Sequence, residues 1–156
     1  MASRFFKERD IANVIDRVNK ELIDNVVGQT CTLYKIDVNH TEVNMYGETA
    51  KGGKLYKQGV EIPCLIEAND FDWNTDEFGP DSNQAVDFKF TRAKLMELKI
   101  LPEVGDLINW NYAHFEVHST NENNLIGGNP DQNHDLVVFT HLTRQTRLNL
   151  VDGRRV

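Results

Sequence analysis

The chain has 156 residues, of which 40% are hydrophobic and 26% are charged, and its formal net charge is −7. This length and composition predict one folded domain with a hydrophobic core, and the negative charge disfavours a protein that wraps nucleic acid on a general basic surface. No apolar run approaches the roughly 20 residues that span a bilayer, and residues 1–10 lack the pattern of a signal peptide. We therefore expect neither membrane insertion nor secretion.

Apolar residues recur at three- and four-residue spacing near the N-terminus, which predicts an amphipathic helix over about residues 5–27. The apolar stripe comprises Ile11, Val14, Ile15, Val18, Leu22 and Val26. Gly28 stands where a helix commonly ends in a left-handed residue. We expect this helix to pack on a small β-sheet formed by the rest of the chain.

The hydrophobic period changes after Gly28 to one typical of strands. Strands are predicted at 30–36, 60–67, 86–91, 107–110, 114–118, 136–142 and 148–151. Pro63 cannot donate to a ladder, so its strand is predicted at a sheet edge or at a bulge. Asn111 and Tyr112 are the predicted turn of a hairpin that begins after Gly105-Asp106. A short helix is predicted over 93–100, stopped by Pro102.

These elements predict a mainly β (α+β) fold class, with the N-terminal amphipathic helix packed on a small antiparallel sheet or barrel with long loops. We expect a single domain over 1–156, in which the sheet occupies about 30–151 and a basic tail occupies 144–156. The two cysteines, Cys31 and Cys64, lie in strand-like runs and are expected to be buried, reduced thiols.

Charge is distributed unevenly along the chain. A glycine-rich loop or hairpin over 47–59 carries Lys51, Lys54 and Lys57. The stretch from Gln58 to Phe88 has no Lys or Arg, and an acidic loop is predicted within it over 70–84. This loop carries the acids Asp70, Asp72, Asp76 and Glu77 together with the aromatic residues Phe71, Trp73 and Phe78. The tail is basic, with Arg144, Arg147, Arg154 and Arg155.

Such asymmetry suits head-to-tail contact between identical subunits, and long loops in a compact domain are usually functional. The loop and tail residues named above are therefore the candidate interface residues. An equally weighted alternative is a solvated acidic loop and a frayed basic tail. The three aromatic residues are candidate anchors for a partner, or they tuck the loop onto its own core.

No motif for catalysis or for a cofactor stands out, so we expect a protein that is not an enzyme and holds no cofactor or metal. Gly47–Lys54 lacks the Lys and Ser or Thr order of a phosphate loop. Asp70, Asp72, Asn74 and Asp76 have the spacing of a calcium loop but lack its glycine and terminal glutamate. His114, Glu116 and His118 share a strand face and leave a zinc site open as an alternative, although histidines on the polar face of a hairpin are favoured.

The order of short motifs resembles the neck, or head-completion, proteins of contractile-tailed bacteriophages. The matching pieces are Gly28 with Leu33-Tyr34, Tyr46-Gly47-Glu48, Glu61-Ile62 with Leu65-Ile66-Glu67, Phe78-Gly79, Val86 to Arg92, Glu103 to Ile108, Phe115-Glu116-Val117, Leu125 to Gly128 and Leu136 to Leu142. The Gly52-Gly53 stretch and the Arg-rich tail depart from the family pattern.

The resemblance implies a structural virion protein made in the host cytoplasm and placed at the head-tail junction. Several copies would form a ring around the DNA channel, with a hexamer among the copy numbers considered, between portal-side proteins and the tail. DNA would pass through without specific binding. The acidic segment would repel phosphates along the channel or pair with the Arg-rich tail of a neighbouring subunit. A tail terminator or another tail-side connector is the alternative, and a small metal- or ligand-binding barrel is a further one.

Overall fold

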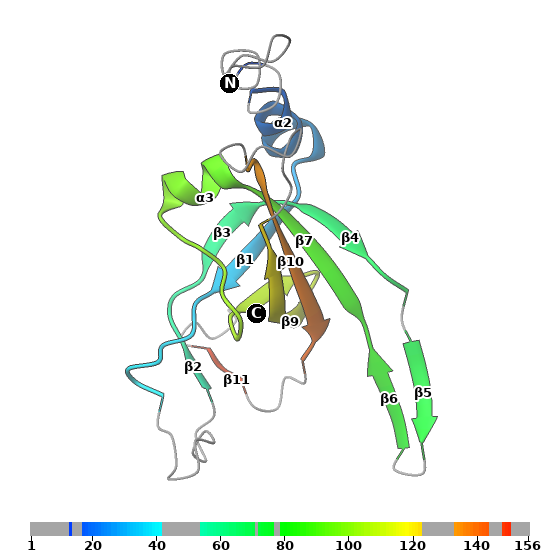
Figure 1. Ribbon diagram of the computed structural model, residues 1–156. Helices are drawn as coiled ribbons and strands as arrows, with labels where there is room; N and C mark the ends of the chain where they lie inside the picture. The colour runs from blue at the N-terminus through cyan, green and yellow to red at the C-terminus, as the bar shows by residue number, and fades with distance from the viewer. Residues whose placement is uncertain are drawn as a thin grey trace, which may run out of the picture.

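A computed structural model of the chain describes residues 13, 17–41, 54–70, 72–76, 79–122, 133–143 and 148–150 (Figure 1). For residues 72–76, 79–82 and 148–150, only the backbone is described. The elements, in chain order, are α2 (Arg17–Glu21), the π-helix η2 (Leu22–Val27), β1 (Thr30–Tyr34), β2 (Lys54–Tyr56), β3 (Val60–Pro63), β4 (Leu65–Ala68), β5 (Asp72–Asp76), β6 (Gly79–Asn83), β7 (Ala85–Thr91), α3 (Arg92–Leu98), β8 (Leu107–Trp110), β9 (Ala113–Asn121), β10 (Asp135–Leu142) and β11 (Leu148–Leu150).

Seven strands form one antiparallel sheet in the order β3-β1-β8-β9-β10-β7-β4. Its two edge strands, β3 and β4, are consecutive in the chain and are separated by Cys64 alone. The sheet must therefore curl until its two edges meet at this residue, as the strands of a barrel do. The mainly β prediction is confirmed, and Pro63 lies in an edge strand as predicted. The predicted strand over 60–67 is instead two strands, because the chain changes partner at Cys64.

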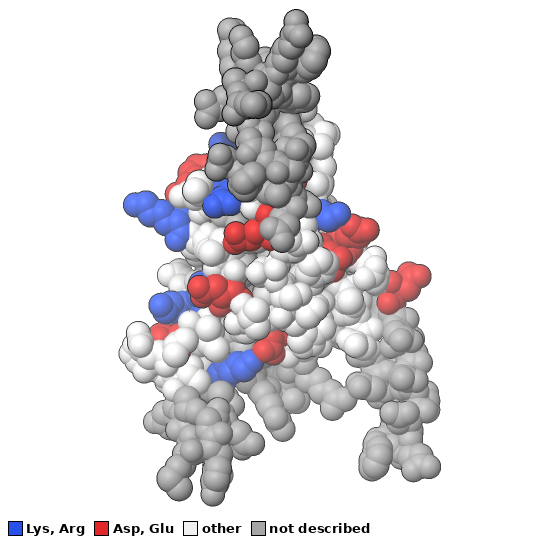
Figure 2. All heavy atoms as spheres, in the orientation of Figure 1, with Lys and Arg blue, Asp and Glu red and all other residues white. Residues whose placement is uncertain are grey.

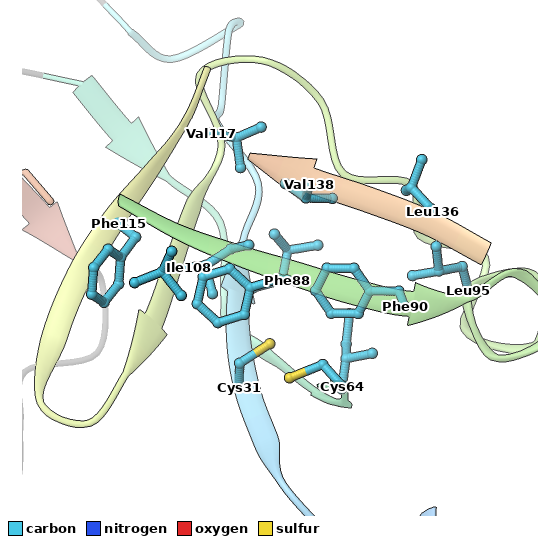
Figure 3. Packing of buried hydrophobic residues seen from close by; sticks show 13 residues of the cluster. Cys31, Cys64, Phe88, Phe90, Leu95, Ile108, Phe115, Val117, Leu136 and Val138 are labelled. Atoms are coloured by element: carbon cyan, nitrogen blue, oxygen red, sulfur yellow. The ribbon is translucent and has the colours of Figure 1, made fainter. Parts of the chain in front are cut away.

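The core of the sheet is built by alternation along β7. Val86, Phe88 and Phe90 are buried, whereas the residues between them are half-buried. Figure 3 shows Phe88 at the centre of a cluster of apolar side chains from several strands. The Phe88 ring lies 6.0 Å from the Phe115 ring and 6.4 Å from the Trp110 ring, both in edge-on arrangements that favour aromatic pairs.

Two thiols lie inside this cluster. Cys31 and Cys64 are free and buried, as expected from the sequence, and their sulfur atoms point toward each other (Figure 3). The hydrogen bond with Cys64, together with burial, raises the pKa of the Cys31 thiol far above its ordinary value. The Cys31 thiol is therefore held in the unreactive protonated form.

The hairpin β8–β9 matches the sequence prediction, including its turn. Asn111 and Tyr112 have φ values of 48° and 64°, which is the pair of left-handed residues that a tight two-residue turn requires. Further along β9 the register with β10 shifts between Phe139 and Thr140, so that His118 is an extra residue in a β-bulge.

Asp106 fixes the start of this hairpin. Its carboxylate is fully buried and accepts hydrogen bonds from the backbone amides of Ile36 at 3.0 Å and Glu103 at 2.8 Å. The Lys35 ammonium lies 2.8 Å from the same carboxylate and 2.8 Å from that of Glu103. A buried charge is tolerated here because each of these donors satisfies it, so Asp106 ties β1 to the segment before β8.

Partial burial tends to lower the pKa of Lys35, but its hydrogen bonds with Asp106 and Glu103 outweigh that effect and raise the pKa above 10.5. The hydrogen bond that Lys35 donates lowers the pKa of Glu103 below its ordinary value of 4.5. Lys35 and Glu103 are therefore both charged across the neutral pH range.

The N-terminal helix differs from its prediction. Apart from Asn13, the described residues of this segment begin at Arg17 and form one α-helical turn that continues into the π-helix η2. Gly28 ends it with φ of 59°, as expected. Ile23 is the buried residue of this segment, whereas Val18 is 56% exposed and Val26 is 72% exposed. The described part of the predicted stripe therefore faces away from the sheet.

The predicted acidic loop over 70–84 is also corrected. Its backbone forms an antiparallel hairpin, β5–β6, in which Asp72 pairs with Asn83 and Asp76 pairs with Gly79. The local preference of Asp and Asn disfavours strands, but the two segments pair with each other as a continuation of the pair β4–β7. Similarly, the helix after β7 ends at Leu98 through the left-handed Lys99, before Pro102 can stop it.

Candidate docking surfaces

The hairpin β5–β6 extends the pair β4–β7 beyond the body of the sheet (Figure 1). We call the paired strands β5 and β6 the arm. Each arm strand pairs only with the other within the described residues, so both outer edges carry unpaired backbone groups. Two-stranded hairpins are marginal by themselves in water, and open strand edges readily pair with another chain. The arm is therefore the first candidate docking surface.

The register of the arm separates its residue types. Directly paired residues of an antiparallel ladder share a face, so Asp72, Asn74 and Asp76 lie at positions on the same face as Asp81 and Asn83. Trp73 and Thr75 lie at positions on the opposite face. The ladder thus places the acidic and amide residues at positions of one face and Trp73 at a position of the other.

A groove lies at the other end of the sheet, beneath α3, with a volume of about 570 Å³. Its apolar lining comprises Leu95, Met96, Ile100, Leu101 and Leu136. Arg92 and Lys99 stand at the two ends of α3, Glu122 directly follows β9, and Asp135 begins β10 opposite Thr91. A groove of this size with an apolar floor and a few charged groups suits a peptide segment or a small ligand.

Apolar side chains are also exposed near this end of the molecule. Val18 and Leu22 of α2 and η2, and Met96 of α3, are 56%, 43% and 67% exposed. Lys20 pairs with Glu97 at 3.6 Å, which holds α2 beside α3. Exposed apolar residues that gather at one end of a small protein are typical of a contact surface.

The sequence prediction placed its interface candidates in three segments, and the structure describes part of them. Asp70 is exposed, and Asp72, Trp73 and Asp76 lie in β5. Lys57 is exposed beside β3. The remaining candidates Lys51, Phe71, Glu77, Phe78, Arg144, Arg147, Arg154 and Arg155 lie outside the described residues.

Lys54 differs from its prediction as a residue of a flexible loop. It begins β2, which pairs in parallel with β11, and its ammonium forms an ion pair with Glu116 of β9. This contact joins the small sheet β2–β11 to the body. The Lys54 ammonium is thus ion-paired within the chain, where it stabilises the fold.

The three residues considered as zinc ligands have different surroundings. His114 is buried, against the prediction of a polar-face histidine, and its Nε2 lies 2.9 Å from Nδ2 of Asn109. Glu116 is paired with Lys54, and His118 at the bulge lies beside the rings of Phe139 and His141. Among the described residues, no three His, Cys, Asp or Glu side chains are grouped to hold a metal ion.

Charges on the visible face of the body are interspersed (Figure 2). Several are paired locally, as in Lys89 with Glu67 at 2.7 Å and Lys94 with Glu97 at 3.5 Å. The groove residues Arg92 and Lys99 were not predicted as functional. Their only signal in the sequence is their position at either end of the short helix, flanking the apolar residues Leu95 and Met96.

Within the described residues, no helix is long and apolar enough to cross a bilayer. No family model matches the chain, and no curated protein matches it. Among solved structures, the chain is similar to a chain of the "Virion of native gene transfer agent (GTA) particle" at 12% sequence identity and a TM-score of 0.45. That match covers 72% of this chain and 91% of the other.

Proposed function

We propose that this protein is a structural, non-enzymatic component of a bacteriophage virion. In this proposal it acts at the neck, where a ring of copies joins the portal side of the head to the tail and gates the DNA channel. The observation that carries the proposal is the arm, a projecting hairpin whose edges are open and whose strands pair only with each other within the described residues. Open strand edges make a free monomer prone to aggregation. An assembly that covers these edges explains why the chain keeps them.

Three further observations support assembly over catalysis. The apolar side chains of Val18, Leu22 and Met96 are exposed near one end of the molecule, where a neighbour can cover them. The order of sequence motifs resembles the neck-protein family, in which the chain would contact head-side and tail-side proteins. The acidic composition of the arm also suits a channel that DNA must leave without sticking, because carboxylates repel phosphates.

The test is mass spectrometry of intact, gradient-banded particles of the phage that carries this gene. A low and fixed number of copies per particle, comparable to that of other connector proteins, is the expected result. Absence from clean particles, with abundance in the infected-cell lysate, would overturn the proposal.

Cross-linking of the same particles distinguishes the neck from the alternative position. Cross-links to the portal or its adaptor on one side and to tail proteins on the other are expected for a neck protein. Cross-links to tail-tube proteins without any to the head side would instead identify a tail terminator or another tail-side connector.

A further inference from the structure

We propose that Cys31 and Cys64 form a redox-sensitive pair, free in reducing surroundings and joined by a disulfide in oxidising surroundings. The bond ties β1 to the residue at which the two edges of the sheet meet. The pair lies in the body of the sheet, so this role does not depend on where the protein acts.

The two thiols lie on the same face of one ladder. Cys31 pairs with Ile62 across β1 and β3, and the Cys64 amide donates a hydrogen bond to the Gln29 carbonyl at 2.9 Å. Side chains two residues apart along a strand share a face, so the cysteines are diagonal neighbours on the core side. Figure 3 shows their sulfur atoms directed toward each other, and the two thiols are hydrogen-bonded.

The fold brings together the two cysteines of the chain, which are far apart in the sequence. Cys64 is the single residue between the edge strands β3 and β4, at the point where the chain changes its strand partner. A covalent bond from this residue to β1 therefore fixes the corner at which the sheet closes. A bond elsewhere along the core strands would only repeat contacts that their hydrogen-bonded ladders already make.

Access to the pair is controlled by the edge strand β3. Cys31 is 2% exposed and Cys64 is fully buried, so an oxidant does not reach either thiol while the sheet is closed. β3 lies at the edge of the sheet, beside β1, and an element at an edge opens locally at a lower cost in free energy than the core strands. Opening of β3 away from β1 uncovers both thiols together.

Formation of the bond requires an electron acceptor, here a small disulfide such as oxidised glutathione. One cysteine loses its proton, and its thiolate attacks the small disulfide, which forms a mixed disulfide and releases one small thiolate. The second cysteine also loses its proton and attacks the sulfur of the first, which forms the internal bond and releases the second small thiolate. The chain thus loses two protons and two electrons, and the small disulfide is reduced to two thiols.

The diagonal placement of the pair makes the bond reversible. Diagonal neighbours in a ladder are farther apart than directly opposed residues, so the bond has to draw β1 and the corner at Cys64 slightly together. A disulfide that needs such a movement is reduced more easily than a relaxed structural one. The bond therefore opens again in a reducing cytosol and persists in oxidising surroundings.

The test is equilibration of the full-length chain with oxidised and reduced glutathione at a series of ratios, under native conditions and in concentrated urea. Each native sample is refolded from urea into its buffer, so that slow access to the core does not limit the reaction. After an acid quench, intact mass spectrometry measures the fraction that has lost two hydrogen atoms, and peptide mapping locates the bond. The native chain is expected to favour the bond by about tenfold or more over the unfolded chain, and the oxidised protein should melt about 3 °C higher or more.

The matched controls are Cys31→Ser and Cys64→Ser, each of which leaves one thiol. Neither should lose two hydrogen atoms or melt higher after oxidation, whatever its own stability. The wild-type measurement compares two redox forms of the same chain, so it decides the proposal even if a serine variant fails to fold. The proposal is overturned if the native chain favours the bond no more than the unfolded chain, or if glutathione adducts persist on the wild type in place of the internal bond.

Discussion

The pair β4–β7 and the arm β5–β6 are two parts of one long hairpin, and they differ in every property that decides stability. In the body, Val86 and Phe88 of β7 are fully buried, and β7 is paired on both sides. In the arm, the corresponding alternate positions hold Asp72, Asn74 and Asp76, and each strand has one partner. Apolar alternation therefore builds the core, whereas the stretch with acidic alternation continues only as a two-stranded extension of the same hairpin.

The largest expected effect tests the core half of this comparison. Phe88→Ala should lower the free energy of unfolding by about 3–5 kcal/mol, because a fully buried ring that packs against three other aromatic rings is removed and a cavity remains. Trp73→Ala in the arm should change it by less than about 0.5 kcal/mol. Urea denaturation measures both, and equal losses would show that the arm is part of the core.

Asp106→Leu should be the next most damaging change, with a loss of about 3 kcal/mol. It leaves the amides of Ile36 and Glu103 without their acceptor and the Lys35 ammonium without its buried partner. The matched control, Glu67→Leu, removes a carboxylate from an exposed ion pair and should cost less than about 1 kcal/mol. Unchanged thermal melting of Asp106→Leu would refute the role given to this residue.

A smaller effect is expected at Gly59, where the body is closely packed. A Cβ at this position would lie 2.6 Å from Cγ2 of Thr32 and 2.7 Å from Cε1 of Tyr34, so neighbouring side chains must shift. Gly59→Ala should therefore lower the free energy of unfolding by about 1–2 kcal/mol, measured by urea denaturation. An unchanged free energy of unfolding would mean that β1 and the segment before β3 can move apart without loss of stability.

The smallest expected effect is the pH-dependent contribution of Glu103, the exposed member of the Asp106 cluster, to the free energy of unfolding. The pKa of Glu103 is lowered, so the stabilisation it provides is present above pH 4.5 and is lost as the pH falls through the lowered pKa. Because this side chain is 66% exposed, Glu103→Gln should cost less than about 1 kcal/mol at pH 7. The gap between the two proteins should close as the pH falls below the lowered pKa of Glu103, and a gap that widens in acid would contradict this assignment.

The body was largely predictable from the sequence because its signals are local and agree with one another. The alternation of Val86, Phe88 and Phe90 predicts a half-buried strand, and Asn111-Tyr112 predicts the turn of β8–β9. Pro63 correctly indicates a sheet edge. The change of strand partner at Cys64 was not predictable, since it depends on the closure of the whole sheet.

The docking surfaces were harder to predict because they contradict local rules. Asp and Asn disfavour strands, yet β5 and β6 form as the continuation of a stable pair, so tertiary context overrides propensity. The apolar spacing of Val18, Leu22 and Val26 predicts a helix packed on its own sheet. Periodicity shows that a face is apolar but does not identify what covers it. The groove arises from segments far apart in the chain and has no sequence motif.

The most direct test of the account is removal of the arm. Residues 70–84 can be replaced by Asn-Gly, because Asn69 already donates a hydrogen bond to the Ala85 carbonyl at 3.1 Å and a two-residue turn can close that pair. The account predicts that this variant keeps the thermal stability of the full chain but remains a monomer in sedimentation at concentrations where the full chain associates. A variant that unfolds, or that associates as the full chain does, would contradict the division into a stable body and a docking arm.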